Sequence, residues 1–223
     1  MNKANKINRR QFMGGTGATI GTGVVVCSGL GVLATIPPTI DFKESSYQKE
    51  NSMTEKILVT YASRTGSTGE VADAIGKELN ESGFSVDVRQ AKHVTDLSEY
   101  NAVVLGSAIY MGSWMPDATK FVEKYRDALS QMPLATFTVS MRMINQPEEH
   151  KALIATHFTE SEQQPRLQPV SNSIFAGRID YGKLPFSYRT IAKMMKAEER
   201  DLRNWDAIRA WAGELTGLLI PVA

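Results

Sequence analysis

Short apolar runs and segments of helical periodicity alternate along the chain from residue 55 onward. The runs at residues 56–59 and 102–107 are almost continuously apolar, as in strands that are covered on both faces. The run at residues 84–88 alternates between apolar and polar positions, which is typical of a more exposed strand. Two further strands are predicted at residues 134–139 and 173–177.

The segments between these runs carry apolar residues at helical spacing. One helix follows the first run, and Gly83 provides its stop. Another begins at Pro116, a residue suited to the first turn of a helix, and a third is predicted at residues 147–162. Asn204 is placed to cap a closing helix. The apolar positions that define the first, second and last of these helices are Val71, Ala72, Ile75 and Leu79; Phe121, Val122, Tyr125 and Leu129; and Trp205, Ile208, Trp211, Ala212, Leu215 and Leu219.

Strand and helix patterns alternate five times, and this alternation predicts the fold class. It indicates an α/β fold of three layers, in which a parallel sheet is covered by helices on both faces. In such folds a ligand binds at the carboxyl ends of the strands, near the point where the strand order reverses. Ligand-binding residues are therefore expected in the loops that follow the carboxyl ends of the strands.

The composition excludes several classes of function. The chain has 223 residues, enough for one α/β domain with additional segments, and its formal net charge is +1. No run of Lys and Arg is interleaved with aromatic residues, so nucleic acid is not an expected partner. The single cysteine, Cys27, excludes an intrachain disulfide, and the three histidines show no spacing suited to metal ligands.

The N-terminal segment carries an unusual distribution of charge. Residues 8–13 resemble the twin-arginine export motif, and an uncharged, glycine-rich stretch follows at residues 11–40. Its moderate hydrophobicity suits a twin-arginine signal better than a packed transmembrane helix. The only charged residues before Asp41 are basic: Lys3, Lys6, Arg9 and Arg10.

These features divide the chain into three expected parts. Residues 1–34 are predicted to be a twin-arginine signal segment, residues 35–54 a polar linker without a core, and residues 55–223 the folded domain. The twin-arginine translocation machinery would export the folded protein from the cytoplasm. Cleavage after Ala34 and retention of an uncleaved membrane anchor both remain open, and the positive residues stay on the cytoplasmic side in either case.

A loop of hydroxyl residues and one glycine, residues 60–68, separates the first strand from its helix. The backbone N–H groups and dipole of a helix N-terminus favour a phosphate there, and short hydroxyl side chains add donors. The loop lacks the G-x-x-x-x-G-K-[ST] pattern, so a nucleoside triphosphate is not its expected ligand. An ordinary turn capped by Ser67 or Thr68 is the alternative. The predicted phosphate-binding residues are Ser63, Thr65, Gly66, Ser67 and Thr68, with Arg64 as an outer contact.

Two further loops should meet the first at the same edge of the sheet. In residues 107–115, Gly112 permits an unusual turn, and Tyr110 and Trp114 are flat enough to stack on a tricyclic ring. The alternative is that these aromatic rings pack against the neighbouring helix. In residues 140–145 the methionines could fill the core and the arginine could be solvated. The residues assigned to the ring are Ser107, Ala108, Ile109, Tyr110, Met111, Gly112, Trp114, Ser140, Met141 and Arg142.

The loop at residues 60–68 resembles the fingerprint of flavodoxins, whose loop holds the phosphate of FMN. Later stretches resemble the flavodoxin-domain family that contains the menaquinone-dependent protoporphyrinogen dehydrogenase. The resemblance extends from Glu55 to the C-terminus. The stretches that carry it are residues 100–110, 132–133, 139–141 and 175–181 and the late Asn204-Trp205 pair.

The resemblance implies a flavodoxin-like fold, a five-stranded parallel sheet in the order 2-1-3-4-5, with FMN as the cofactor. It further implies two-electron oxidation of a reduced substrate, with a quinone as acceptor, so the expected partner is a quinone or a redox protein. FMN would carry the chemistry while the protein supplies orientation and charge. Arg142 is a candidate for tuning the flavin, because a nearby cation favours the reduced ring.

The rival interpretation is an exported flavodoxin that carries electrons between protein partners and has no substrate site. Carrier flavodoxins surround the flavin with acidic residues, whereas the only acid near the second loop here is Asp117 and the third loop carries Arg142. This pattern favours an enzyme. A third interpretation, in which FMN serves the regulation or assembly of a membrane complex, stays open. No catalytic triad, Cys-His pair or carboxylate pair indicates a hydrolytic mechanism.

Overall fold

The structure is a computed structural model. Two predicted elements, the signal segment at residues 1–34 and the helix at residues 147–162, lie outside the residues that it describes, and so do Met111 and Arg142. The described residues are 39–48, 55–110, 112–141, 167–184, 186–194 and 197–220.

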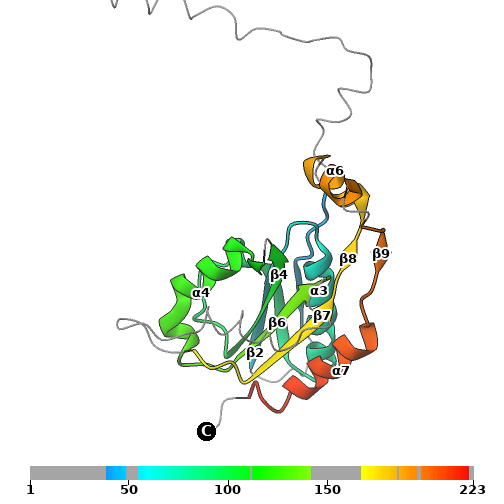
Figure 1. The fold of residues 1–223 in the computed structure, drawn as a ribbon. Helices are drawn as coiled ribbons and strands as arrows, with labels where there is room; N and C mark the ends of the chain where they lie inside the picture. The colour runs from blue at the N-terminus through cyan, green and yellow to red at the C-terminus, as the bar shows by residue number, and fades with distance from the viewer. Residues whose placement is uncertain are drawn as a thin grey trace, which may run out of the picture. The chain divides into compact units, whose positions relative to one another are not determined.

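Five parallel strands form the centre of the domain (Figure 1). They lie in the order β3-β2-β4-β6-β7, and every neighbouring pair is parallel. Because β2 is the first of these five strands in the sequence, this is the predicted order 2-1-3-4-5, and the prediction is confirmed. The strands are β2 (Lys56–Ala62), β3 (Ser85–Gln90), β4 (Ala102–Tyr110), β6 (Leu134–Ser140) and β7 (Ser171–Ala176).

Two short strands extend the sheet beyond the prediction. β5 (Ser113–Trp114) pairs antiparallel with the end of β4. β1 (Ser45–Tyr47) pairs antiparallel with β3 at the edge of the sheet. Since β1 lies within the segment predicted as a linker, residues 35–54, that prediction is wrong for the described part of the segment. The polar sequence of this segment did not indicate a strand. Its hydrogen-bond partners lie far away in the sequence, on α3 (Ser67–Glu81) and β3.

The two faces of the sheet carry separate cores. Successive side chains in a strand point to opposite faces, so Ile57, Val59 and Tyr61 of β2 face one core and Leu58 and Ala62 face the other. Figure 1 shows the helices that complete the three layers. The helices α3 (Ser67–Glu81) and α7 (Trp205–Leu215) cover the first face, and α4 (Pro116–Leu129) with the short turn η1 (Ala91–His93) covers the second.

The predicted helix boundaries are confirmed by local geometry. Gly83, with φ of 107°, follows the end of α3, and Pro116 occupies the first turn of α4. Asn204 caps α7, where its side-chain oxygen accepts a hydrogen bond from the backbone N–H of Ala207 at 3.0 Å. These caps satisfy or redirect backbone groups that a helix leaves unpaired at its ends.

A segment that we call the excursion, residues 178–201, leaves the sheet after β7 and returns before α7. It contains β8 (Arg178–Ile179), η3 (Tyr181–Lys183), α6 (Phe186–Met194) and β9 (Arg200–Asp201), and β8 pairs antiparallel with β9. Within the described part of the chain, no helix combines the length and the apolar character needed to cross a membrane.

Candidate functional site

The strand register brings the three predicted loops together at the carboxyl end of the sheet. Ala62, the last residue of β2, lies opposite Ser107 of β4. Ala108 of the same strand lies opposite Val139 of β6. The loops that follow β2, β4 and β6 therefore begin at adjacent positions, as expected for a ligand site in a parallel α/β sheet.

The first loop ends in a left-handed turn at Gly66, which has φ of 86°. The side-chain oxygen of Ser63 accepts a hydrogen bond from the backbone N–H of Gly66 at 3.0 Å. Helix α3 begins directly afterwards at Ser67, and no side chain caps it. The alternative of a turn capped by Ser67 or Thr68 is therefore not what the structure has. A helix N-terminus without a side-chain cap leaves its N–H groups available to an anion.

Thr68 carries an orphan hydroxyl in the first turn of α3. Its side chain is fully buried, and its Oγ1 has no hydrogen-bond partner among the described residues. Buried polar atoms are rarely left unsatisfied, because each costs free energy. Ser63, Arg64, Thr65 and Ser67 are all partly exposed beside it. An orphan donor at an uncapped helix N-terminus fits a bound phosphate.

Packing beneath the loop explains the first glycine of α3, Gly69. A Cβ atom at this position would lie 2.7 Å from the ring of Tyr61, which is itself fully buried. Contacts this short do not occur without a shift of the ring. Gly69 therefore allows Tyr61 to support the loop from below, which sequence reasoning missed.

Arg64 connects the first loop to the second. The carbon at the centre of its guanidinium group lies 4.2 Å from the centroid of the Tyr110 ring, within the range of a cation–π contact. The prediction gave Arg64 an outer phosphate contact and Tyr110 a stacking role. In the structure the two side chains stack on each other, so a positive charge lies where the two loops meet.

The second loop is a hairpin of β4 and β5, in which Gly112 adopts φ of 83°. Trp114 is only 2% exposed, and its ring nitrogen donates to the hydroxyl of Thr138 at 2.9 Å. The hydroxyl of Ser107 accepts from the backbone N–H of Met115 at 2.9 Å. The structure therefore places Trp114 in the core under α4, as in the alternative stated for it, and not at an open ring-binding face. Tyr110 is the partly exposed aromatic residue of this hairpin.

The third loop is described only at its start. Ser140, the last residue of β6, is 6% exposed, and Met141 follows it. The Met141 sulfur would lie 3.5 Å from a Cβ atom at Gly177, so this side chain reaches toward the end of β7. Arg142 lies beyond the described residues, and its role in tuning a flavin stays a prediction.

A cluster of cations surrounds one carboxylate in the first turn of α3. Glu70 accepts from Lys183 at 2.9 Å and from Arg203, and Arg178 lies 4.0 Å away. Burial alone would raise the pKa of Glu70, but the hydrogen bonds from Arg203 and Lys183 outweigh it and hold that pKa below its ordinary value. The ion pairs fix the excursion to the helix that begins at the first loop. These ion pairs were not predicted, because their partners are too far apart in the sequence to form a recognisable local pattern.

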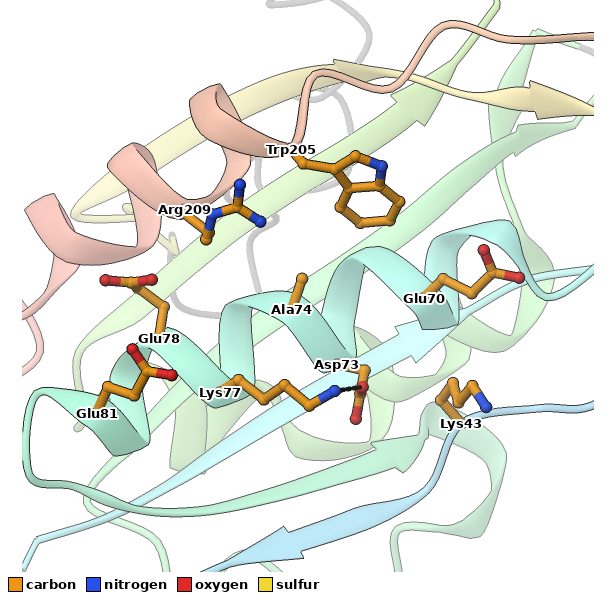
Figure 2. Close-up of a pocket in the computed structure, with 9 residues that line it drawn as sticks. All are labelled: Lys43, Glu70, Asp73, Ala74, Lys77, Glu78, Glu81, Trp205 and Arg209. Carbon is orange, nitrogen blue, oxygen red and sulfur yellow. Dashed lines mark ion pairs between the residues drawn. The ribbon is translucent and has the colours of Figure 1, made fainter.

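A groove of about 400 Å³ runs along the outer side of α3, between α7 and the residues before β1 (Figure 2). Ala74 and Trp205 form its apolar part, and Asp73 pairs with Lys77 at 2.9 Å. None of the predicted phosphate-binding or ring-binding residues lines it. Among the described residues there is also no group of three or more side chains suited to hold a metal ion.

Comparisons with known proteins agree with this arrangement. Residues 58–204 match a family described as the flavodoxin domain. Protoporphyrinogen IX dehydrogenase [quinone] of Escherichia coli (strain K12) is 25% identical over 174 residues, which cover 73% of this chain and 96% of the relative. A protein of the same name from Leishmania major is 24% identical, covering 77% of this chain and 79% of the relative.

Solved structures with a similar course of the chain include oxidised Flavodoxin 2 from Bacillus cereus. It has 22% identity and a TM-score of 0.43, and the match covers 63% of this chain and 99% of that structure. The two-electron reduced flavodoxin of Megasphaera elsdenii has 13% identity and a TM-score of 0.45, with 71% and 98% covered.

The orphan hydroxyl gives a prediction that separates ligand binding from stability. Thr68→Val should raise the free energy of unfolding of the ligand-free protein by about 1 kcal/mol, because an unsatisfied buried group is removed. The same change should weaken FMN binding by roughly 10-fold or more, the cost of a lost hydrogen bond to a charged group. Urea unfolding and fluorescence titration with FMN measure the two effects.

The matched control is Thr136→Val, which removes another buried threonine hydroxyl, one without a partner in the described ranges, from the middle of β6 and away from the loops. It should change stability in the same direction and leave the dissociation constant for FMN unchanged. If both variants bind FMN like the wild type, the hydroxyl of Thr68 does not serve the ligand.

Proposed function

The chain belongs to the flavodoxin domain family, and from that premise we propose that it is an FMN-dependent oxidoreductase that passes electrons from a reduced substrate to a quinone-type acceptor. The family match covers most of the folded domain. The names of the relatives from Escherichia coli and Leishmania major, protoporphyrinogen IX dehydrogenase [quinone], support an oxidoreductase with a quinone acceptor. Protoporphyrinogen or a related reduced compound is accordingly the first substrate to assay.

FMN is the cofactor of this family, and the residues of this chain fit its phosphate. Gly66 turns the chain so that the uncapped start of α3 faces the site, and the buried hydroxyl of Thr68 has no partner there among the residues that the structure describes. Ser63, Thr65 and Ser67 would add hydroxyl groups around the same phosphate. Bound FMN supplies the transfer of two electrons.

The observation that carries the proposal is the charge of the three loops. Residues 60–68, 107–115 and 140–145 contain two arginines, Arg64 and Arg142, and no Asp or Glu. A cation about 4 Å from a developing negative charge contributes roughly 4 kcal/mol at an effective dielectric constant near 20, before screening by solvent. Such loops favour the acceptance of electrons from a substrate, whereas acidic loops oppose it.

The second candidate is an electron carrier that is reduced and reoxidised by protein partners. The family match itself supports it, because the family description names a flavodoxin domain and no catalytic activity. The two functions differ in what they require of the protein: a carrier needs a low reduction potential and an open flavin edge, and an enzyme needs turnover of a small substrate. The potential of the bound flavin and turnover with quinones therefore separate them.

We predict that Arg142→Ala and Arg64→Ala each lower the two-electron midpoint potential of the bound flavin. Solvent reduces the direct interaction severalfold, and a residual ~1.4 kcal/mol corresponds to about 30 mV for two electrons. Both variants should also slow reduction of menadione during steady-state turnover with protoporphyrinogen. Dye-coupled redox titration measures the potential.

The control is Arg209→Ala, since Arg209 is exposed on α7 and pairs with Asp206 of the same helix. It should leave the potential and the turnover unchanged. Unchanged potentials in the Arg64 and Arg142 variants would contradict the electrostatic argument. A low wild-type potential without quinone turnover would decide for the carrier.

We propose further that the protein acts outside the cytoplasm, after export by the twin-arginine translocation machinery. The paired Arg9 and Arg10, followed by the uncharged stretch at residues 11–40, support this location. Export of a folded protein suits a flavoprotein, because the cofactor can be loaded before translocation. Quinone acceptors in the membrane would then be within reach of either a released or an anchored protein.

Replacement of Arg9-Arg10 by Lys-Lys keeps the charge but removes the paired guanidinium groups, so it should trap the protein in the cytoplasm. Cell fractionation with immunodetection measures the effect, and Lys3→Arg with Lys6→Arg serves as the control that should export normally. If the Lys-Lys variant is exported like the wild type, the twin-arginine route is wrong, and a wild type found only in the cytoplasm would contradict the location. An exported protein that begins at Thr35 would establish cleavage, and one that retains residue 1 would establish an anchor.

A further inference from the structure

The described residues 39–48, which precede β2, lie outside the family match of residues 58–204. We call residues 39–47 the arm. Its last three residues are β1, which pairs with β3, and its Phe42 and Tyr47 pack against the core under α3 and α7. The arm therefore lies outside the matched part of the domain, and it is held in a defined register.

Two buried carboxylates hold the arm from opposite faces of the sheet. The hydroxyl groups of Ser45 and Tyr47 both donate to Oδ1 of Asp73 on α3, the former at 2.9 Å. The hydroxyl of Ser46 donates to Oδ1 of Asp87 on β3 at 2.5 Å. Alternate residues of a strand point to opposite faces, so the sequence Ser-Ser-Tyr supplies one donor set to each carboxylate.

These carboxylates depend on the donors that the arm supplies. Asp73 is 8% exposed and Asp87 is 6% exposed. Burial alone would raise the pKa of each, but the hydroxyl groups of the arm, together with Lys77 for Asp73 and Lys56 for Asp87, lower both pKa values below the ordinary range. If the arm left the sheet, Asp73 would lose two of its hydrogen-bond donors.

The other end of the arm touches the first loop. A Cβ atom at Gly66 would lie 3.2 Å from Cγ2 of Ile40 and 3.3 Å from the backbone oxygen of Asp41. The loop glycine and the arm are thus in close contact at the turn that leads into α3. Figure 2 shows Lys43 of the arm beside the start of α3, with Glu70 and Asp73 on the helix.

A second contact runs through Tyr61. The backbone oxygen of Lys43 accepts a hydrogen bond from the Tyr61 hydroxyl at 2.8 Å, and the ring of Tyr61 lies against Gly69 of α3. Burial raises the pKa of this hydroxyl, so it stays a neutral donor. The arm therefore meets the first loop directly at Gly66 and indirectly, through Tyr61, at Gly69.

We propose that the arm is part of the FMN site: docked on Asp73, it holds the turn at Gly66 in the conformation that binds the phosphate. Ser45, Tyr47 and Asp73 are then positioning residues, which act on the phosphate through the arm and the loop. Because coupling between two equilibria is reciprocal, bound FMN must stabilise the docked arm to the same extent as the docked arm strengthens binding. This inference rests on the assignment of FMN to the first loop.

The arm also directly follows residues 1–38 in the sequence. Binding of FMN therefore changes how firmly the chain is held immediately after that segment. In an exported protein, this coupling means that cofactor binding stabilises the residues directly after the signal segment.

The test combines binding and hydrogen exchange on the full chain. The double variant Ser45→Ala with Tyr47→Phe removes both hydroxyl donors and keeps the strand and the aromatic ring, and Tyr47→Phe alone is the milder form. Lys77→Ala is the matched control, because Lys77 pairs with Asp73 at 2.9 Å from a largely exposed position on α3 and its removal leaves both hydroxyl donors of the arm in place. Each protein is titrated with FMN, and exchange of the arm amides is followed with and without FMN.

We expect the double variant to bind FMN about tenfold more weakly, Tyr47→Phe to lie between it and the wild type, and Lys77→Ala to stay within about twofold of the wild type. In the wild type, FMN should slow exchange at residues 40–47 severalfold, and the double variant should lose this protection. A local loss of stability alone would speed exchange of the arm but leave the effect of FMN on it unchanged.

Wild-type affinity in the double variant, or arm exchange that FMN does not alter in the wild type, would overturn the inference and leave the cofactor assignment intact. Failure of the wild type to bind FMN would overturn both. The two failures are therefore distinguishable in one set of measurements.

Discussion

The left-handed turn at Gly66 is the constraint on which the site depends. A residue with a side chain would be strained at φ of 86°, and its Cβ would press on Ile40 and Asp41. The turn connects β2, which is buried in the centre of the sheet, to α3, whose Val71, Ile75 and Leu79 are fully buried against that sheet. The core thus fixes the direction of the helix axis, and the turn at Gly66 places the uncapped N-terminus of α3 at the site. A site built on rigid elements in this way needs little reorganisation to receive a phosphate.

The same helix start carries a charge that must be balanced. Glu70 is favourable at a helix N-terminus, where the dipole is positive, but its carboxylate would repel a bound phosphate. Lys183 of the excursion and Arg203, just after it, bind the carboxylate directly and Arg178 approaches it, so these cations neutralise the carboxylate. Arg203 is also held by Asp201 and stacks on Trp205. The excursion thus supports α3 through ion pairs with Glu70, and the arm supports it through hydroxyl groups that donate hydrogen bonds to the buried Asp73.

Local patterns predicted the layers and the helix caps of this domain, because each depends on residues that are close in sequence, whereas the strand order came from the resemblance to flavodoxins. They also located the first loop, where strand, glycine and helix follow one another. They missed β1 and the excursion, since Ser45 and Asp73, or Glu70 and Lys183, meet only in three dimensions. The sequence could not place Trp114, because an aromatic residue in a loop can stack on a ligand or pack in the core. Its hydrogen bond to Thr138 and its exposure of 2% show that it packs in the core.

The central claim is that the first loop holds the phosphate of FMN. Titration of the purified, cofactor-free protein with FMN and with riboflavin tests it most directly, because the two ligands share the ring and differ in the phosphate alone. Two or more hydrogen bonds to a charged group correspond to a difference of about 100-fold or more in affinity. The account predicts that FMN binds more tightly than riboflavin by at least that order. Equal affinities, or no binding of FMN, would contradict it.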